Sequence, residues 1–266
     1  MAGHIRCAEE GAVAWVTLSH PGKFNAMSRG MWRELKALFL DLPGRSHLRC
    51  VVVQGDAGHF CAGGDIAEYP DFRFDEASLR DFHENDVWGG LSAMLDCDIP
   101  VVAAIEGNCM GAGVELASCC DLRLAGQSAR FGAPIARLGF PMAPREAQLV
   151  ATAVGDLSAR EMLLAAAVLP AGLMLQRGFL SSVVPDAAVA DEARALAARV
   201  STLAPLTARV HKQTLRALGP LNPLGPTPAM ATLLERAYAY APDAEHREGI
   251  AAFLAKRPPE FQSNQT

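Results

Sequence analysis

The chain has 266 residues, half of them hydrophobic and a fifth charged, a composition typical of a globular protein with a sizeable core. This length suits one large domain, or one domain with a small appendage. The net charge of −5 gives no electrostatic reason to expect nucleic acid or an anionic membrane as a partner. No apolar run is long enough to span a bilayer and the N-terminus lacks a signal-peptide core, so we expect a cytoplasmic protein.

Alternating apolar runs and amphipathic stretches predict an α/β core followed by a helical tail. The expected strands cover 12–18, 50–54, 101–105, 121–125 and 179–184. The expected helices cover 29–40 (with Ser28 as a suitable N-cap), 84–95, 114–120, 145–154 and 158–167. Residues 66–86 look polar and irregular. From Ala187 onward the pattern is helical, apart from a Pro/Gly-rich loop at 219–228. We therefore expect an α/β core over 1–190 and a C-terminal helical region over 191–266.

The seven cysteines are scattered, and no two of them have CxxC spacing or a histidine cluster beside them. Several lie in apolar runs, which favours buried, reduced thiols over disulfides or metal ligands. We therefore expect no metal site.

The segment 100–123 contains an apolar strand, a glycine loop and the start of a helix. The loop carries Gly107, Gly111 and Gly113, and Glu115 lies just inside the helix. A glycine loop that leads into a helix aims free backbone N–H groups at one point, which suits an anion or an oxygen that becomes one during a reaction. The glycine spacing is not GxGxxG, which argues against a dinucleotide-binding motif.

A second glycine loop, FCAGGDI at 60–66, also follows a buried strand. Its Gly63 and Gly64 permit unusual backbone angles and the close approach of a ligand. Taken alone, such a loop is more often an ordinary turn. Two loops that each present an N–H group to one oxygen, however, make an oxyanion hole.

Together these loops resemble those of the crotonase family, also called the enoyl-CoA hydratase/isomerase superfamily. The similarity extends in family order over nearly the whole chain. The matching segments are HPGKFNAM at 20–27, FCAGGDI at 60–66, the specific glycine segment at 99–123, FGAP at 131–134 with Leu-Gly at 138–139, and REGIAAFLAKRP at 247–258.

The resemblance implies a crotonase-like spiral of ββα units, in which helices surround two roughly perpendicular sheets. It also implies a C-terminal helical region that supports a homotrimer, or a hexamer of paired trimers. The implied ligand is an acyl-CoA thioester, so coenzyme A enters as part of the substrate and no separate cofactor is expected. The thioester carbonyl would accept hydrogen bonds from the backbone N–H groups of Gly64 and Ala112. The family usually has glycine at the position of Ala112, but alanine keeps the N–H group.

The resemblance further implies a set of coenzyme A contacts. Lys23, Phe24 and Ala26 would lie near the adenine and phosphates; Ala62, Asp65 and Ile66 near the adenine and pantetheine; and Phe253 and Lys256 near the coenzyme A of a neighbouring subunit. For Lys23 and Lys256, a solvated surface lysine is an equal alternative.

Hydratases of the family use two glutamates, and this sequence matches only the first, Glu115. The second position is Ile135, which cannot move a proton. Relatives that use a later position for a base or a hydrogen-bonding group have no counterpart here, since Met142 and Ala143 occupy it. The remaining candidates for a polar group near the reaction, each of which also fits a purely structural role, are Glu68, Tyr69, His83, Arg137, Arg145 and Glu146.

Three functions stay open at this point. The first is an acyl-CoA enzyme of hydratase/isomerase type, in which Glu115 acts as the acid/base. The second is another crotonase-fold reaction, such as decarboxylation of an acyl-CoA, which Ile135 and the nearby arginines favour. The third is a non-catalytic acyl-CoA binder.

Overall fold

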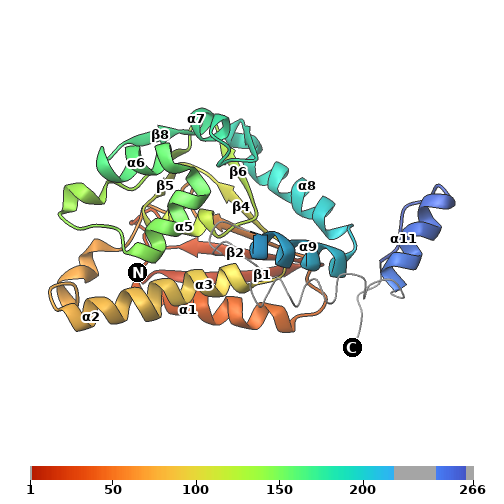
Figure 1. Cartoon of the computed structure of the whole chain (residues 1–266), viewed down its shortest axis with the longest axis horizontal. Coiled ribbons are helices and arrows are strands. Elements are labelled where there is room, and N and C mark those ends of the chain that lie inside the picture. Colours follow the sequence, from red (N-terminus) through yellow and green to blue (C-terminus); the bar gives the residue numbers. More distant parts are fainter. Residues whose placement is uncertain (1, 219–243, 262–266) are drawn as a thin grey trace.

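Six strands form the main sheet of the computed structural model, which describes residues 2–218 and 244–261 (Figure 1). In sheet order they are β1 (His4–Glu10), β2 (Val13–Ser19), β3 (Cys50–Gly55), β4 (Val101–Ile105), β6 (Leu122–Gly126) and β9 (Ser182–Val184). β1 pairs antiparallel with β2, and every later neighbour is parallel. The central strand β4 is buried along its whole length, as expected for an apolar run in a parallel sheet covered on both faces.

A second, three-stranded sheet lies beside the glycine loops. Its strands, in order, are β5 (Asn108–Met110), β7 (Arg130–Gly132) and β8 (Val168–Pro170). β5 is parallel to β7, and β7 is antiparallel to β8. The sequence analysis predicted none of these strands, because three residues are too few for a periodic pattern.

Helices surround both sheets. They are α1 (Arg29–Asp41), α2 (Glu76–Asp81), α3 (Trp88–Asp96), α4 (Ala112–Ser118), α5 (Pro144–Val154), α6 (Asp156–Leu164), α7 (Ala171–Gln176), α8 (Val189–Ser201), α9 (Pro205–Leu218) and α11 (Ala244–Leu254). A 3-10 helix, Ile66–Asp71, and a π-helical turn, Phe82–Val87, fill the stretch that the sequence analysis described as irregular. The prediction for 66–86 was therefore wrong: helix begins at Glu76 rather than at 84, and the π turn joins α2 to α3.

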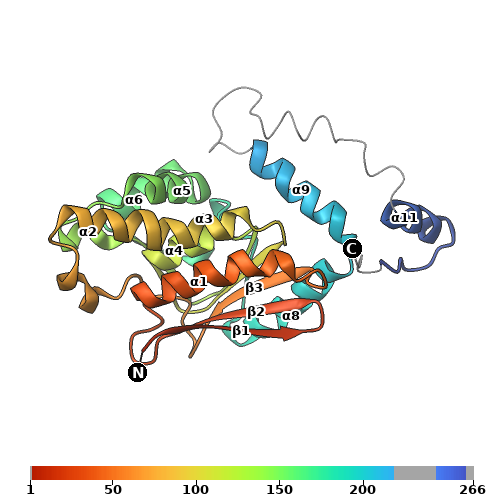
Figure 2. The same ribbon diagram turned by 90° about the horizontal axis from the view of Figure 1, so that it is seen from below.

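Two hydrophobic layers cover the main sheet. α1 and α3 pack together on one face, and α8 packs on β3, β4 and β6 of the other face (Figure 2). Ser28 caps α1 as predicted, because its hydroxyl accepts a hydrogen bond from the Met31 N–H group at 3.2 Å.

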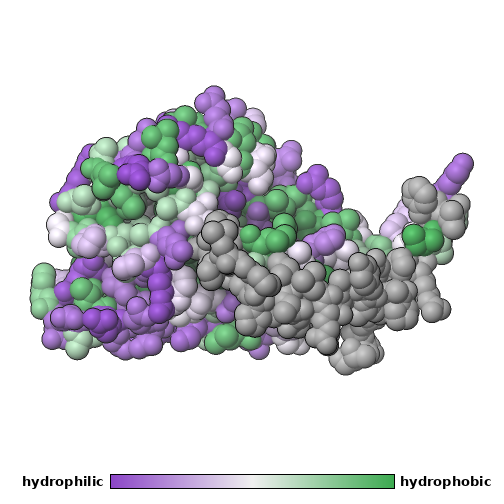
Figure 3. Space-filling view, viewed as in Figure 1, coloured by the Kyte–Doolittle hydropathy of each residue, from purple (hydrophilic) through white to green (hydrophobic). Residues whose placement is uncertain are grey.

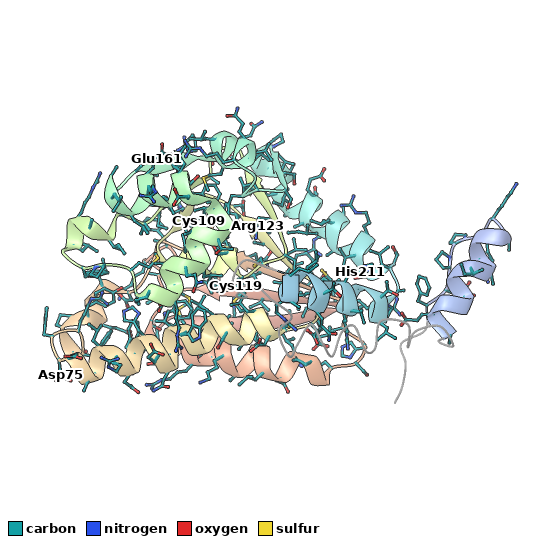
Figure 4. All side chains as sticks on the ribbon, viewed as in Figure 1. Asp75, Cys109, Cys119, Arg123, Glu161 and His211 are labelled. Atoms are coloured by element: carbon teal, nitrogen blue, oxygen red, sulfur yellow. The ribbon has the colours of Figure 1, made fainter. Side chains whose placement is uncertain are left out.

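Six of the seven cysteines are buried and all seven are free thiols, as the sequence analysis expected. Cys109 and Cys119 lie inside the fold, whereas the charged Asp75 and Glu161 lie at its margin (Figure 4). Within the described residues, no group of three or more His, Cys, Asp or Glu side chains is placed to hold a metal ion.

α11 stands apart from the main body in both ribbon views (Figures 1 and 2). Polar contacts attach α9: the Lys212 ammonium lies 2.8 Å from the Asp121 carboxylate, and Arg209 donates to the Leu48 carbonyl. In the described part of the chain, no helix is both long enough and apolar enough to cross a membrane.

Candidate active site

The two glycine loops lie side by side because their backbones pair. Cys61 forms a parallel bridge with Cys109: its N–H group donates to the Asn108 carbonyl, and its carbonyl accepts from the Met110 N–H group, both at 2.8 Å. Gly113 has to be glycine at this contact, since a Cβ atom there would lie 2.7 Å from the Cys61 carbonyl oxygen. The pairing brings together two segments that lie about fifty residues apart in the sequence.

Within the described residues, the N–H groups of Gly64 and Ala112, one from each of the paired loops, have no hydrogen-bond acceptor. Ala112 begins α4, where the first N–H groups of a helix have no partner inside the helix. Its φ angle lies outside the left-handed region, so alanine fits here without backbone strain. Gly64 and Ala112 line the same cavity.

This cavity has a volume of about 310 Å³ and a largely apolar lining. Both glycine loops contribute to it, and so do the 3-10 segment Pro134–Leu138 and the π turn. Its side-chain lining includes Trp32, Ile66, Tyr69, Arg73, Phe82, His83, Glu115, Ile135, Arg137, Phe140 and Met142. A concave, mostly apolar site with a few polar groups is typical of small-molecule binding.

Glu115 supplies the one carboxyl group that lines the cavity within the described residues. It lies in the first turn of α4 and is 9% exposed. Burial, and then the negative charge of Glu146, raise the pKa of Glu115 to about 8. At neutral pH its carboxyl group is therefore mostly protonated, and a modest change of environment makes it a base.

The raised pKa of Glu115 predicts a pH-dependent stability. Because the folded state favours the neutral carboxyl, the contribution of Glu115 to the free energy of unfolding is greatest below the usual carboxyl pKa of 4.5. This contribution is lost as pH rises through about 8. We expect Glu115→Gln to unfold at a higher temperature than the parent protein at pH 9, with a smaller difference at pH 5. Thermal unfolding at both values measures this, with the exposed Glu76→Gln as the control. If the difference in unfolding temperature between Glu115→Gln and the parent is the same at pH 5 and pH 9, the pKa of Glu115 is not raised by burial.

Ile135 lines the same cavity and contributes only apolar surface. His83, on the π turn, also lines the cavity, and its Nδ1 lies 3.1 Å from the Glu146 carboxylate. Glu146 itself is only 2% exposed and does not line the cavity. The sequence analysis named both residues separately, but their pairing depends on the contact between the π turn and α5.

The remaining acid/base candidates differ in position. Tyr69 lines the cavity, and its hydroxyl oxygen lies so close to Gly64 that a Cβ added there would be 2.3 Å away. Glu68 instead accepts a hydrogen bond from the Arg29 N–H group at 2.8 Å, and Arg145 pairs with Glu84 at 2.9 Å. Neither Glu68 nor Arg145 lines the cavity.

The candidate coenzyme A residues divide into two groups. Ala62 and Ile66 line the cavity. Lys23, Phe24, Ala26 and Asp65 lie in or beside the adjacent 20–27 loop and do not line it. The Lys23 ammonium lies 2.6 Å from the buried Asp65 carboxylate, so this lysine is anchored rather than freely solvated.

Of the two C-terminal candidates, Lys256 does not line the cavity within this chain. Lys256 is exposed and follows α11. The Phe253 side chain lies outside the described residues, so its predicted contact stays a prediction.

Comparisons with known proteins identify the family. The family model described as enoyl-CoA hydratase/isomerase matches residues 8–264. The chain is 31% identical over 253 residues to the 2,3-dehydroadipyl-CoA hydratase of Escherichia coli, covering 94% of this chain and 95% of that protein. It is also 31% identical over 257 residues to the mevalonyl-coenzyme A hydratase of Beauveria bassiana, covering 94% of this chain and 91% of that protein.

A solved structure agrees with this identification. The fold matches a crystal structure of an enoyl-CoA hydratase/carnithine racemase from Magnetospirillum magneticum with a TM-score of 0.91, at 33% identity over 98% of this chain and 96% of that one. The chain therefore belongs to the enoyl-CoA hydratase/isomerase family, the crotonase superfamily that its glycine loops resemble.

Proposed function

We propose that this protein acts on an acyl-CoA thioester by stabilising the enolate of that thioester, with Glu115 as its acid/base group. The observation that carries the proposal is one cavity that, within the described residues, is lined by the buried Glu115 carboxyl and by the N–H groups of Gly64 and Ala112, which have no acceptor. The N–H groups of Gly64 and Ala112 would donate to the thioester oxygen. Because the negative charge on that oxygen grows as the enolate forms, the donors would stabilise the transition state more than the substrate.

Glu115 has the protonation behaviour that this chemistry requires. The carboxylate of a group with a pKa of about 8 is basic enough to take the C2 proton of a 3-enoyl thioester, and the carboxyl group so formed can return that proton to C4 of the dienolate. One such group is sufficient to move a proton along the acyl chain. Hydration also needs a group that activates water, and His83 and Tyr69 are titratable side chains of the cavity wall that could supply it.

The experiment that tests the proposal is a panel of neutral enoyl-CoA substrates. The 2-enoyl-CoAs of increasing length would be assayed for hydration, and the corresponding 3-enoyl-CoAs for isomerisation. Turnover of either series by the parent protein supports the proposal. Absence of turnover across both series, and also with the corresponding enoyl-CoAs that end in a second carboxylate, contradicts it.

Ile135 favours a second candidate, decarboxylation of a carboxylated acyl-CoA. Loss of CO₂ beside a thioester passes through the same enolate but needs no base to start it, so an apolar residue at position 135 is compatible with the reaction. Release of CO₂ from malonyl-type thioesters separates this candidate from the first. A non-catalytic acyl-CoA binder would instead bind such esters without turning over either class.

We also propose that the protein assembles as a homotrimer or a hexamer through its C-terminal helices. Val210, Leu215 and Leu218 of α9 are exposed, and exposed apolar surface of this kind is typical of an interface. Apolar surface also gathers around α6, whose Leu157 and Leu164 are more than half exposed (Figure 3). Light scattering is expected to give three or six times the chain mass of 28.2 kDa. A monomer at micromolar concentration contradicts this assembly.

A further inference from the structure

Arg73 lies in the wall of the cavity and pairs with no carboxylate within the described residues. Within the described residues, none of its guanidinium N–H groups has a hydrogen-bond acceptor. By contrast, Arg29 and Arg145 on neighbouring elements each pair with a carboxylate at 2.6 to 2.9 Å. Arg73 is partly buried, and this burial lowers its pKa, although an arginine stays charged. A cation that leaves water without an anion carries an uncompensated desolvation cost.

Two aromatic rings hold the guanidinium in place. Its central carbon lies 3.6 Å from the centre of the Phe140 ring and 4.6 Å from the centre of the Tyr69 ring. Packing against rings occupies the faces of a guanidinium, but its N–H donors lie in its plane and stay available at the edge. A planar fork of donors matches the two oxygens of a carboxylate.

Tyr69 connects this cation to the proposed thioester position. Its ring packs against Arg73, and its hydroxyl oxygen lies beside Gly64. An acyl chain whose carbonyl met Gly64 would therefore extend along Tyr69 toward Arg73. The apolar Phe82, on the π turn, contributes to the wall of the same cavity.

The charges of the cavity favour an anion. Arg137 is a second cation of the lining, and its guanidinium donates a 3.4 Å hydrogen bond to the Ala166 carbonyl. Glu115 is the one carboxyl of the lining within the described residues, and its pKa of about 8 leaves it mostly neutral. At neutral pH the described lining therefore carries positive charge that no ionised carboxylate of the lining offsets.

We infer that the cavity selects acyl-CoA esters whose acyl chain ends in a second carboxylate, and that Arg73 binds this distal carboxylate with its free N–H edge. The inference rests on the proposed function, because it assumes a thioester at Gly64 and Ala112. The ligand class is an ω-carboxyacyl-CoA, and its carboxylate is ionised at neutral pH. The competing anion is a phosphate of coenzyme A itself.

Binding of saturated esters tests this inference without requiring any reaction. Succinyl-, glutaryl- and adipoyl-CoA would each be compared by calorimetry with the neutral acyl-CoA of the same carbon number. We expect the parent protein to prefer at least one carboxylated ester, and Arg73→Gln to reduce that preference roughly 10- to 100-fold. Arg73→Lys keeps the charge without the fork and should retain part of the preference. The control is Arg80→Gln, which alters an exposed arginine paired with Glu76 and should keep the full preference.

The outcomes separate this inference from the proposed function. If the parent protein binds carboxylated and neutral esters equally well, the inference is overturned. It is also overturned if Arg73→Gln weakens the binding of both ester types equally, because Arg73 would then serve packing alone. Weaker binding of free coenzyme A by Arg73→Gln assigns the arginine to a phosphate and also overturns it. Turnover of neutral enoyl-CoAs without a carboxylate preference leaves the proposed function standing. An Arg73-dependent preference without turnover of any enoyl-CoA supports the site and contradicts the proposed reaction.

Discussion

Glu115→Gln is expected to lower kcat/KM for an enoyl-CoA substrate by about 10²- to 10⁴-fold, the usual contribution of a general acid/base. Glutamine has nearly the shape of the neutral carboxyl group but can neither take nor give a proton. Because the two N–H groups remain, binding of a saturated acyl-CoA should change little. Steady-state kinetics and calorimetry on the same preparation measure both effects.

A matched variant for this experiment is Glu146→Gln. The negative charge of Glu146 helps to raise the pKa of Glu115, so its removal should shift the pH profile of kcat toward lower pH while activity persists. If Glu115→Gln keeps activity within a few-fold of the parent, Glu115 is not the acid/base and His83 becomes the candidate.

Ala112→Pro is expected to lower kcat by about 10²- to 10³-fold, the effect of deleting one oxyanion donor. Proline removes the N–H group of Ala112 and nothing else that the loop needs. Ala112 is the first residue of α4, a position where proline fits a helix, and the preceding residue is the unrestrictive Gly111. The measurement is kcat, together with the binding of a saturated acyl-CoA.

Ala112→Gly is the control, since it keeps the N–H group and restores the residue that the family usually has. Its kcat should stay within a few-fold of the parent, and both variants should show the circular dichroism of the parent. Equal activity of the proline and glycine variants would falsify the assignment of this N–H group as a donor.

The sequence predicts best those parts of the fold that depend on local patterns. The continuous apolar run of β4 and the Ser28 cap of α1 are both found where the pattern places them. β1 was missed because its residues are polar and mostly exposed, and its antiparallel pairing with β2 is what makes it a strand. The π turn was missed for a related reason, since its extra residue depends on what packs around it, including buried Asp86 between Arg29 and Arg33.

The candidate site shows the same contrast between residues in local sequence motifs and residues placed by contacts that form only in the fold. Glu115, Gly64 and Ala112 were predicted because the motifs that carry them are contiguous in sequence. Arg73 was not named, since no motif surrounds it and its place in the cavity depends on two rings from different segments. Two further features arise only when α4, α5 and the π turn pack together. They are the burial that raises the pKa of Glu115 and the contact between His83 and Glu146.

The π turn has a consequence for how this protein could acquire new substrates. Phe82, His83 and Val87 all reach the cavity from this one turn, which contains one residue more than an α-helical turn. Deleting a single residue here would restore regular helix, in which this turn carries one side chain fewer, while α2 and α3 keep their relative orientation because the π turn already accommodates the extra residue. Such a deletion would present different side chains to the acyl group while leaving the paired glycine loops untouched. Relatives that differ by one residue in the length of this helix are therefore expected to differ in the acyl group they accept rather than in the reaction they perform.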